Sequence, residues 1–416
     1  MNQLNVRVLG AVLLASCWAG CAGNQTGHVS ATTMGDTSHP AERGSPTAAL
    51  EQACGAQGDL TSDATPRIRR APYLQQLTTS SVIVGWLSTT GDGERIDVTR
   101  PDGTAVVTAQ GKDDTSVRAT GEKQMWSTIT GLEPDTVYCY TLAAGSTSLS
   151  ERIGFRTAPA ADATRTVKFL AFGDSGGGGS DQFALLEQMM KVPFDIIIHT
   201  GDIAYDSGTL NEFEDNVFAV YSDLFRHFGF FPAAGNHDYK TMQGAPFRDV
   251  FNLPADNGEK WYSYDYGPVH FVALDTESDY ATQMKWLDRD LAATKQPWKI
   301  LYMHKPPYSS GEHGSDVKLR MGLEPLLAKY NVQLVLAGHD HDYERVKPQN
   351  GVEFIVTGGG GKGTRPVGSN PFTEFSIDVI HFVYVEVKQD ELVLHAIDGT
   401  GVEFDSVVVP RERDAV

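Results

Sequence analysis

Five short apolar runs recur through the middle of the chain, and each has about the length of a strand. They read VKFLAF at 167–172, FDIIIHT at 194–200, FFPAA at 230–234, WKILYM at 298–303 and VQLVLA at 332–337. Nearly continuous apolar residues over such a length are typical of strands that are buried on both faces. Helix-compatible segments lie between them, at 180–191, 209–226, 281–294 and 316–330. This alternation predicts an α/β architecture for the region 165–409.

The region 67–160 has a different pattern, in which apolar and polar residues alternate. SSVIVGWL at 80–87 and LEPDTVYCYTLA at 132–143 have the period of half-buried strands, and PDG at 101–103 is typical of a turn. The pattern predicts a small all-β sandwich, and we expect it to support the α/β region rather than to bind a ligand of its own.

A short polar cluster follows each of the five buried runs. The clusters are GDSG with Asp174, GDIAY with Asp202 and Tyr205, GNHD with Asn236, a single His304, and GHDH with His339 and His341. Active sites of α/β sheets gather at the carboxyl ends of strands, so these side chains are expected to meet. Two cations about 3.5–4 Å apart need a shared oxygen ligand, for which Asp202 is the natural choice. Oxygen and imidazole donors without a thiolate favour Fe, Mn or Zn.

The ordered clusters GDxG, GDxxY, GNH, a strand ending in His, and GHxH resemble those of the purple acid phosphatases, which are calcineurin-like metallophosphoesterases. The resemblance extends over about residues 166–345, and GHDHDYER at 338–345 is especially similar to the family's last motif. It implies two mostly buried sheets flanked by helices. Leu132, Pro134, Thr136 and Tyr138 also resemble a stretch of fibronectin type III domains, in which the tyrosine hydrogen-bonds to the backbone at a corner. Such a domain is typical of the larger family members.

The resemblance also implies a role for each predicted ligand. It assigns Asp174, Tyr205 and His341 to a ferric ion, Asn236, His304 and His339 to a divalent Fe, Zn or Mn ion, and Asp202 to a bridge between the two. Tyr205 distinguishes this family from the wider metallophosphoesterases, which generally lack a tyrosine ligand there. Its phenolate oxygen suits Fe(III) and would give a charge-transfer colour.

Two further histidines are candidates for catalysis, because a leaving oxygen must be protonated and phosphoryl charge neutralised. His237 follows Asn236 directly, and His313 lies in the loop KPPYSSGEHG. Plant-like relatives often have an adjacent histidine pair in this loop, whereas Gly314 occupies the second position here. The expected reaction is attack of a metal-bound hydroxide on phosphorus. The remaining strand histidines are interpreted as structural; they are His199, His270, His381 and His395.

Two glycine-rich segments need an interpretation. TGGGGKGT at 357–364 is not a Walker A loop, because Gly363 follows Lys362 where serine or threonine is required. Gly176 to Gly179 lack the context of a dinucleotide fold, and either let the backbone approach the metal site or form a flexible loop.

Residues 1–21 have the pattern of an export signal, with Arg7 before the short apolar stretch VLGAVLLAS. LASC at 14–17 and WAGC at 18–21 both resemble the lipobox of bacterial lipoproteins. Cleavage before Cys21 is favoured, because it leaves Cys54 and Cys139 as an even pair that could form a disulfide. The expected protein is lipid-anchored in a bacterial envelope; an ordinary signal would make it periplasmic or secreted.

Residues 22–66 contain few large apolar side chains and are predicted to form a disordered tether. A net charge of -19 and a pI near 5.0 disfavour nucleic acid as a partner. The lipid anchor is the only membrane contact expected.

The function expected from these patterns is that of an acid phosphatase acting on small phosphomonoesters through a binuclear metal centre. Two alternatives remain open at this stage. One is a related metallophosphodiesterase that uses Mn or Zn in the same site. The other is a surface binding protein with a structural metal site, which would need neither His237 nor His313. The sequence does not indicate the oligomeric state.

Overall fold

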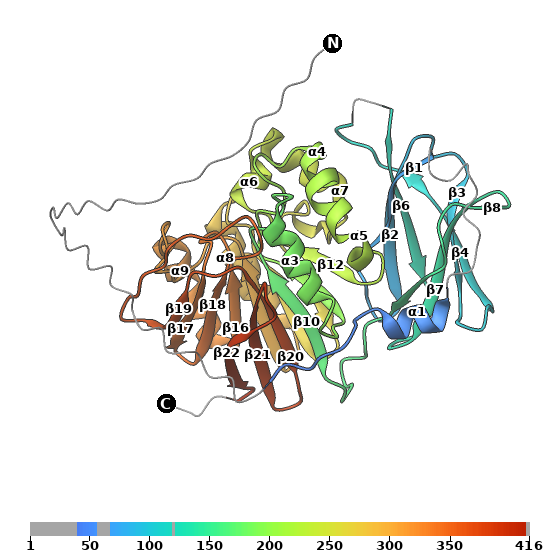
Figure 1. The fold of residues 1–416 in the computed structure, drawn as a ribbon. Helices are drawn as coiled ribbons and strands as arrows, with labels where there is room; N and C mark the ends of the chain where they lie inside the picture. Colours follow the sequence, from blue (N-terminus) through green and yellow to red (C-terminus); the bar gives the residue numbers. More distant parts are fainter. Residues whose placement is uncertain (1–39, 56–66, 119–120, 413–416) are drawn as a thin grey trace, which may run out of the picture. The chain divides into compact units, whose positions relative to one another are not determined.

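A computed structural model describes residues 40–55, 67–118 and 121–412 of the 416-residue chain (Figure 1). The predicted export signal lies outside the described residues. No helix within the described ranges is both long and apolar enough to cross a bilayer.

The region 67–160 folds into two sheets, as the alternating pattern predicts. One sheet has the order β1-β2-β6-β5, and the other the order β4-β3-β7-β8 with β9 also paired to β7. The strands are β1 (Ile68–Gln75), β2 (Ser81–Ser88), β3 (Glu94–Thr99), β4 (Ala105–Gln110), β5 (Lys112–Asp113), β6 (Lys123–Thr130), β7 (Val137–Ala144), β8 (Thr147–Ser148) and β9 (Ile153–Arg156). Tyr138 is buried, and its hydroxyl accepts a hydrogen bond of 3.0 Å from the backbone N–H of Glu133. That contact is the one expected of a corner tyrosine.

The α/β region contains a first sheet with the order β12-β11-β10-β20-β21-β22. β10, β11 and β12 are parallel, whereas β20, β21 and β22 are antiparallel. The strands are β10 (Val167–Phe172), β11 (Ile196–His199), β12 (Gly229–Pro232), β20 (His381–Val387), β21 (Glu391–Asp398) and β22 (Glu403–Pro410).

The second sheet has the order β13-β14-β15-β16-β18-β17-β19, with β14, β15, β16 and β18 parallel. Its strands are β13 (Tyr262–Tyr266), β14 (Val269–Ala273), β15 (Trp298–Met303), β16 (Leu334–Ala337), β17 (Tyr343–Gln349), β18 (Val352–Thr357) and β19 (Thr373–Ile377). The two sheets pack through aromatic side chains, including Phe169 against Phe271 at 5.4 Å and Phe231 stacked on Tyr264 at 3.9 Å between ring centroids. The prediction of two buried sheets is confirmed.

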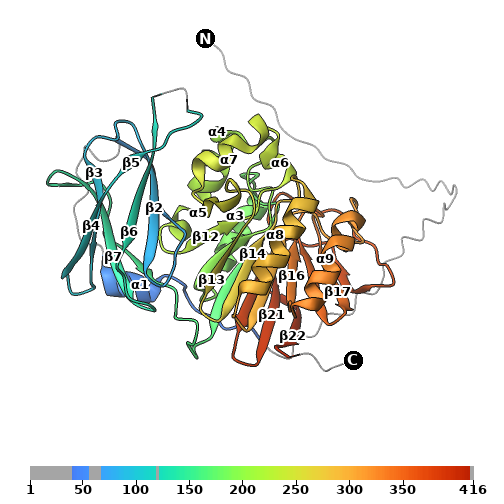
Figure 2. The same cartoon turned by 180° about the vertical axis from the view of Figure 1, so that it is seen from behind.

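Helices cover the outer faces of both sheets (Figures 1 and 2). On the first sheet, Tyr221 of α5 packs on Phe172. On the second, leucines spaced by four residues in α8 and α9 pack into a common core with Val272, Leu301 and Val335. The helices are α3 (Ser180–Met189), α4 (Leu210–Phe213), η1 (Glu214–Phe218), α5 (Ala219–Phe225), α6 (Asn236–Tyr239), η2 (Met242–Gly244), α7 (Ala245–Val250), η3 (Ala255–Asn257), α8 (Tyr280–Ala293) and α9 (Val317–Lys329).

Polar side chains fix where these helices begin. Asp279 accepts a hydrogen bond from the backbone of Thr282 at the start of α8, and Asp316 accepts one from Leu319 at the start of α9. Thr209 and Glu212 form a capping box at the start of α4. Such caps satisfy N–H groups that have no partner within the helix. The predicted helix over 209–226 is therefore present, although it contains a π-helical turn at 214–218.

The prediction of a disordered tether over 22–66 is wrong for residues 40–55. Residues Ala48–Cys54 form α1, whose Leu50 and Cys54 side chains are buried. Cys54 forms a disulfide with Cys139 of β7. The covalent link and the burial of Leu50 anchor a segment whose composition alone is too polar to fold. Residues 22–39 and 56–66 lie outside the described residues.

Ion pairs join the β-sandwich to the α/β region. The Arg118 guanidinium lies 2.9 Å from Asp249 of α7 and 2.9 Å from Glu214 of η1. Arg70 of β1 lies 3.0 Å from the same Glu214 oxygen. Both arginine side chains are only 3% exposed, so these pairs are shielded from water and fix how the sandwich lies against the helices.

Candidate metal centre

The hydroxyl of Tyr205 lies at the centre of one group of predicted ligands. It is 2.9 Å from Asp174 Oδ1, 3.1 Å from Asp202 Oδ2 and 3.1 Å from His341 Nε2. All four side chains are buried. The structure therefore brings together the three residues predicted to bind a ferric ion and the predicted bridge.

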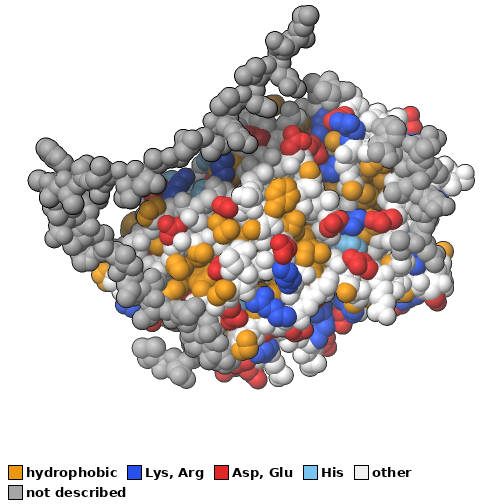
Figure 3. All heavy atoms as spheres, viewed as in Figure 1, with side chains coloured by type: hydrophobic (Ala, Val, Ile, Leu, Met, Phe, Trp, Pro, Cys, Tyr) orange, Lys and Arg blue, Asp and Glu red, His pale blue; other side chains and the backbone are white. Residues whose placement is uncertain are grey.

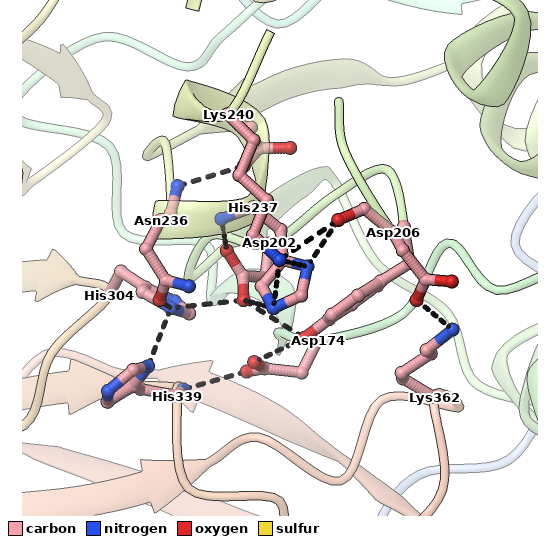
Figure 4. Close-up of polar contacts among 12 residues, drawn as sticks. Asp174, Asp202, Asp206, Asn236, His237, Lys240, His304, His339 and Lys362 are labelled. Carbon is pink, nitrogen blue, oxygen red and sulfur yellow. Dashed lines mark hydrogen bonds and ion pairs between the residues drawn. The ribbon is translucent and has the colours of Figure 1, made fainter. Parts of the chain in front are cut away.

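A second group lies on the other side of Asp202 (Figure 4). His304 Nε2 lies 3.1 Å from Asn236 Oδ1, 3.1 Å from His339 Nδ1 and 3.4 Å from Asp202 Oδ2. Ligand atoms of Asp202, His304 and His339 all lie within 4.8 Å of one another. His304 Nδ1 donates to the backbone oxygen of Thr200 at 3.0 Å, so Nε2 is the ring nitrogen directed at the other predicted ligands.

The positions of these side chains follow from the ends of five strands in two sheets. Asp174 and Asp202 follow the parallel pair β10 and β11, and Asn236 follows β12. His304 follows β15, while His339 and His341 follow its parallel neighbour β16. The ligands therefore converge because the carboxyl ends of both sheets meet.

Glycines before the ligands allow this close approach. A Cβ atom at Gly235 would lie 2.2 Å from Asp202 Oδ1, and one at Gly338 would lie 2.5 Å from Asp174 Oδ2. Gly176 pairs with Ala204 as an isolated bridge, and a Cβ there would lie 1.8 Å from the Ile203 oxygen. The first glycines of the motifs, and Gly176, thus let backbone and carboxylates meet.

Asp238 holds the loop that carries Asp202 and Tyr205. Its buried carboxylate accepts backbone hydrogen bonds from Ile203 at 3.0 Å, Ala204 at 3.1 Å and Gly235 at 2.8 Å. Sequence reasoning missed this role, although Asp238 belongs to the GNHD cluster. The signal in the sequence that could have indicated this role is a short acidic side chain two residues after the predicted ligand Asn236.

Burial and nearby charge shift the protonation of the predicted ligands. Burial and the carboxylates of Asp174 and Asp202 raise the pKa of Tyr205 well above its usual value. Burial would raise the pKa of Asp202, but neighbouring His304 and the backbone N–H of His237 lower it overall. A cation beside the phenol oxygen would oppose the effect of the carboxylates on Tyr205.

His237, the first predicted catalytic residue, lies beside the metal ligands. Its backbone N–H donates to Asp202 Oδ1 at 2.7 Å, and its ring lies 4.4 Å from that of Tyr205 between centroids. Nδ1 donates to the backbone oxygen of Asp206 at 2.7 Å, which leaves Nε2 3.9 Å from Asp202 Oδ2. Lys240 Nζ lies 2.9 Å from the same Nδ1 (Figure 4).

His313, the second predicted catalytic residue, lies beside the other group of ligands. Its ring lies 4.1 Å from that of His339 between centroids. Its Nδ1 and its backbone N–H both donate to Asp340 Oδ1, at 3.0 and 2.8 Å. The side chain is 39% exposed, so it borders solvent as a group that meets substrate would.

The four histidines interpreted as structural have partners away from the ligand atoms. His199 Nε2 lies 2.9 Å from Ser175 Oγ, and burial lowers the pKa of His199 to about 3. The other contacts are those of His270 with Asp265 and Asp290, His381 with the Val379 backbone, and His395 with Glu403. His199 braces Ser175, the neighbour of Asp174, and does not itself reach the ligands.

Known proteins carry the same fold. The family model of the calcineurin-like phosphoesterases matches residues 167–343. The structure of a purple acid phosphatase from yellow lupin seeds superposes with a TM-score of 0.74, at 22% identity, over 82% of this chain and 74% of the lupin protein. The match and the superposition agree on one fold.

Residues 167–343 form a calcineurin-like phosphoesterase domain.

Purple acid phosphatases are also among the relatives of this domain in sequence. A probable inactive purple acid phosphatase of Arabidopsis thaliana is 28% identical over 305 residues, which are 58% of this chain and 48% of the plant protein. Human acid phosphatase type 7 is 26% identical over 326 residues, which are 67% of this chain and 72% of the human protein. The aligned part of the chain spans about half the length of this plant protein and of two other curated relatives. The plant relative is named probable inactive, whereas the human relative is named an acid phosphatase.

Proposed function

We propose that this protein is an acid phosphatase that hydrolyses small phosphomonoesters at a binuclear metal centre. The observation that carries the proposal is the position of the Tyr205 hydroxyl, which lies within 3.1 Å of Asp174, Asp202 and His341. A phenol that meets two carboxylates and an imidazole in a buried site is a donor set suited to Fe(III).

The donors fit two cations that share one ligand. Asp174, Tyr205 and His341 would hold the ferric ion, and Asn236, His304 and His339 a divalent Fe, Zn or Mn ion. Asp202 lies in both groups and would bridge them. When bound, a metal pair of this kind activates a water molecule for attack and neutralises charge on the phosphoryl group.

His237 and His313 would serve the substrate from opposite groups of ligands. The Asp206 backbone oxygen accepts from His237 Nδ1, so that Nε2 is directed to the site, and an imidazolium at His237 could donate from Nε2 to a phosphoryl oxygen and neutralise part of its charge. Asp340 accepts from His313 Nδ1 in the same way, and an imidazolium at His313, which also carries a proton on Nε2, could give that proton to the leaving oxygen. Both side chains are partly exposed, which gives substrate access to them.

We further propose that the protein is exported and works in an oxidising compartment. The Cys54–Cys139 disulfide supports this, because such bonds persist mainly outside the cytoplasm. Anchoring by a lipid at Cys17 or Cys21, a tether before residue 40 and a fibronectin type III-like sandwich remain parts of this proposal.

The test is a visible absorption spectrum, metal analysis and phosphatase assay of the purified protein and of Tyr205→Phe. We expect a purple band that Tyr205→Phe removes, with iron and a second metal at about one each per chain. Matched variant Tyr308→Phe, whose hydroxyl contacts Glu324 away from the ligands, should keep the band.

Other outcomes point to the alternatives. A colourless, active protein that contains Mn or Zn would be a metallophosphoesterase of the wider superfamily, and assay with bis(p-nitrophenyl) phosphate would then identify a diesterase. A colourless protein that holds metal but hydrolyses neither compound would contradict the proposal and favour a binding protein.

A further inference from the structure

A glycine-rich loop of unassigned role lies directly under the predicted metal centre. Residues 358–365, GGGGKGTR, are here called the basic loop. Its backbone is hydrogen-bonded to the predicted ferric ligands: the N–H of Lys362 donates to the Asp174 oxygen at 3.0 Å, and that of Arg365 to the His341 oxygen at 2.9 Å. The loop is therefore fixed relative to the centre.

The glycines of the basic loop allow this fixed position. A Cβ atom at Gly358 would lie 2.1 Å from the Asp340 oxygen, and one at Gly360 would lie 2.1 Å from the Gly173 oxygen. The backbone thus passes too close to the ligand strands for larger residues. Lys362 and Arg365 are the charged residues of the basic loop, and both side chains extend towards the predicted metal centre.

Lys362 reaches the side of the centre where His237 lies. Its Nζ is 2.7 Å from Asp206 Oδ1 and 4.8 Å from the centroid of the Tyr205 ring (Figure 4). His237 contacts the same two residues, through the Asp206 backbone and the Tyr205 ring. Lys240 adds another cation, because its Nζ lies 3.1 Å from the Asp206 oxygen.

Arg365 reaches the side of the centre where His313 lies. Its Nη1 is 3.3 Å from His313 Nδ1, and its Nε is 3.4 Å from Glu312 Oε2. The basic loop thus places one cation beside each predicted catalytic histidine. In Figure 3, Lys or Arg atoms lie beside His atoms in the hollow at the upper left of the face shown.

The present partners of these cations can be displaced. The side chain of Asp206 is 76% exposed and that of Glu312 is 65% exposed, and exposed ion pairs contribute little to stability. An anion bound at the centre would compete with both carboxylates. Arginine can hold a phosphate through two parallel N–H groups, whereas lysine acts as a point charge.

We propose that Lys362 and Arg365 bind a second anionic group of the substrate, beyond the phosphoryl group that is hydrolysed. The inference rests on the proposed phosphatase function and names its preferred substrates, which are phosphate esters or anhydrides with a further phosphate or carboxylate group. A chain with a net charge of -19 repels anions in general, so local cations at the site decide which anions are retained.

The test compares the wild type with the double variant Lys362→Gln/Arg365→Gln. Substrates are inorganic pyrophosphate, which has a second phosphate, and p-nitrophenyl phosphate, which has none. We expect kcat/KM for pyrophosphate to fall about 10- to 100-fold more than that for p-nitrophenyl phosphate, mainly through KM, since each charge-assisted hydrogen bond is worth about tenfold or more. Lys329→Gln, which removes an exposed lysine of α9 that pairs with Asp288 of α8, should change neither value.

Binding is measured separately from turnover by calorimetry with imidodiphosphate and inorganic phosphate. The wild type should bind imidodiphosphate at least about tenfold more tightly, and the double variant should lose most of this preference. Equal losses for both substrates, or equal binding of both anions by the wild type, would overturn the inference. If the wild type hydrolyses neither substrate, the proposed function is wrong, and calorimetry alone then decides the role of the basic loop.

Discussion

The side chain of Asp340 lies between two predicted ligands in the sequence, yet it contacts His313. Its buried carboxylate accepts from the His313 backbone and from Nδ1 at one oxygen, and from the Ser309 hydroxyl at the other. It therefore holds a proton on Nδ1 of His313 and directs Nε2 away from Asp340, as the proposed role of His313 at the leaving oxygen requires. Asp340 is a positioning residue that the GHDH spacing did not reveal.

We expect Asp340→Ala to slow the hydrolysis of esters with poor leaving groups in particular. The kcat for glycerol phosphate should fall about 100-fold, as expected when general acid catalysis is lost, and that for p-nitrophenyl phosphate by much less. Ser309→Ala is the control: it removes the contact to the other Asp340 oxygen and the hydrogen bond from the Gly311 N–H but keeps both contacts of His313, and it should have a small effect on both substrates. An equal fall for both substrates would mean that Asp340 supports the metal ligands and not His313.

At the scale of elements, the side chain of His270 forms ion pairs that connect β14 with β13 and α8. This β14 side chain lies 2.7 Å from Asp265 of β13 and 2.9 Å from Asp290 of α8, and it is only 7% exposed. Burial lowers its pKa, but the two carboxylates outweigh burial and raise the pKa of His270 to about 9. A raised pKa in the folded state adds stability that is complete below the ordinary value of about 6.5 and is lost as pH rises through 9.

The variant His270→Gln should therefore be less stable by about 2–3 kcal/mol at pH 6, and this difference should shrink towards pH 9.5. Urea unfolding at a series of pH values measures it. Ser263→Ala removes a hydrogen bond to Asp290 but leaves the imidazolium, so its effect should not follow the same pH dependence. A His270→Gln difference that is constant from pH 6 to 9.5 would show that His270 is neutral in the folded protein.

The elements that the sequence predicted best are those whose side chains are uniformly buried. The run at 167–172 is strand β10 without a change of boundary, and five of its six residues are buried. The run at 230–234 is longer than its strand, which ends at Pro232, since the following residues turn towards Asn236. The convergence of the ligands could be predicted from the ends of the strands. The positions of Lys362 and Arg365 could not, because their glycine-rich loop lies outside the five ligand clusters and does not match a phosphate-binding motif. Only the tertiary contacts of the basic loop place them beside the site.

At the scale of the whole molecule, the segment 40–54 links the β-sandwich to the phosphoesterase domain. Arg43 donates to the Gly401 oxygen at 2.9 Å, and the Ala41 N–H to Glu403 at 2.9 Å, both near the turn between β21 and β22. From there the chain reaches α1, which the disulfide joins to β7. Polar composition predicted disorder here, since the count of apolar residues takes no account of a covalent link between distant residues.

We expect the variant Cys54→Ala/Cys139→Ala to unfold at a lower temperature than the wild type. The disulfide closes a loop of 85 residues, and removing such a link costs about 2–4 kcal/mol, mainly because the unfolded chain gains freedom. Scanning calorimetry with and without dithiothreitol measures the change, and trypsin cleavage after Arg43 reports release of the segment. The reductant should lower the Tm of the wild type to that of the variant and leave the Tm of the variant unchanged.

Metal content should be equal in both proteins, because neither cysteine contacts a predicted ligand. An unchanged Tm would show that the contacts of Arg43 and Ala41 suffice to hold the segment, whereas a loss of metal would show that the sandwich and the metal centre fold as one unit.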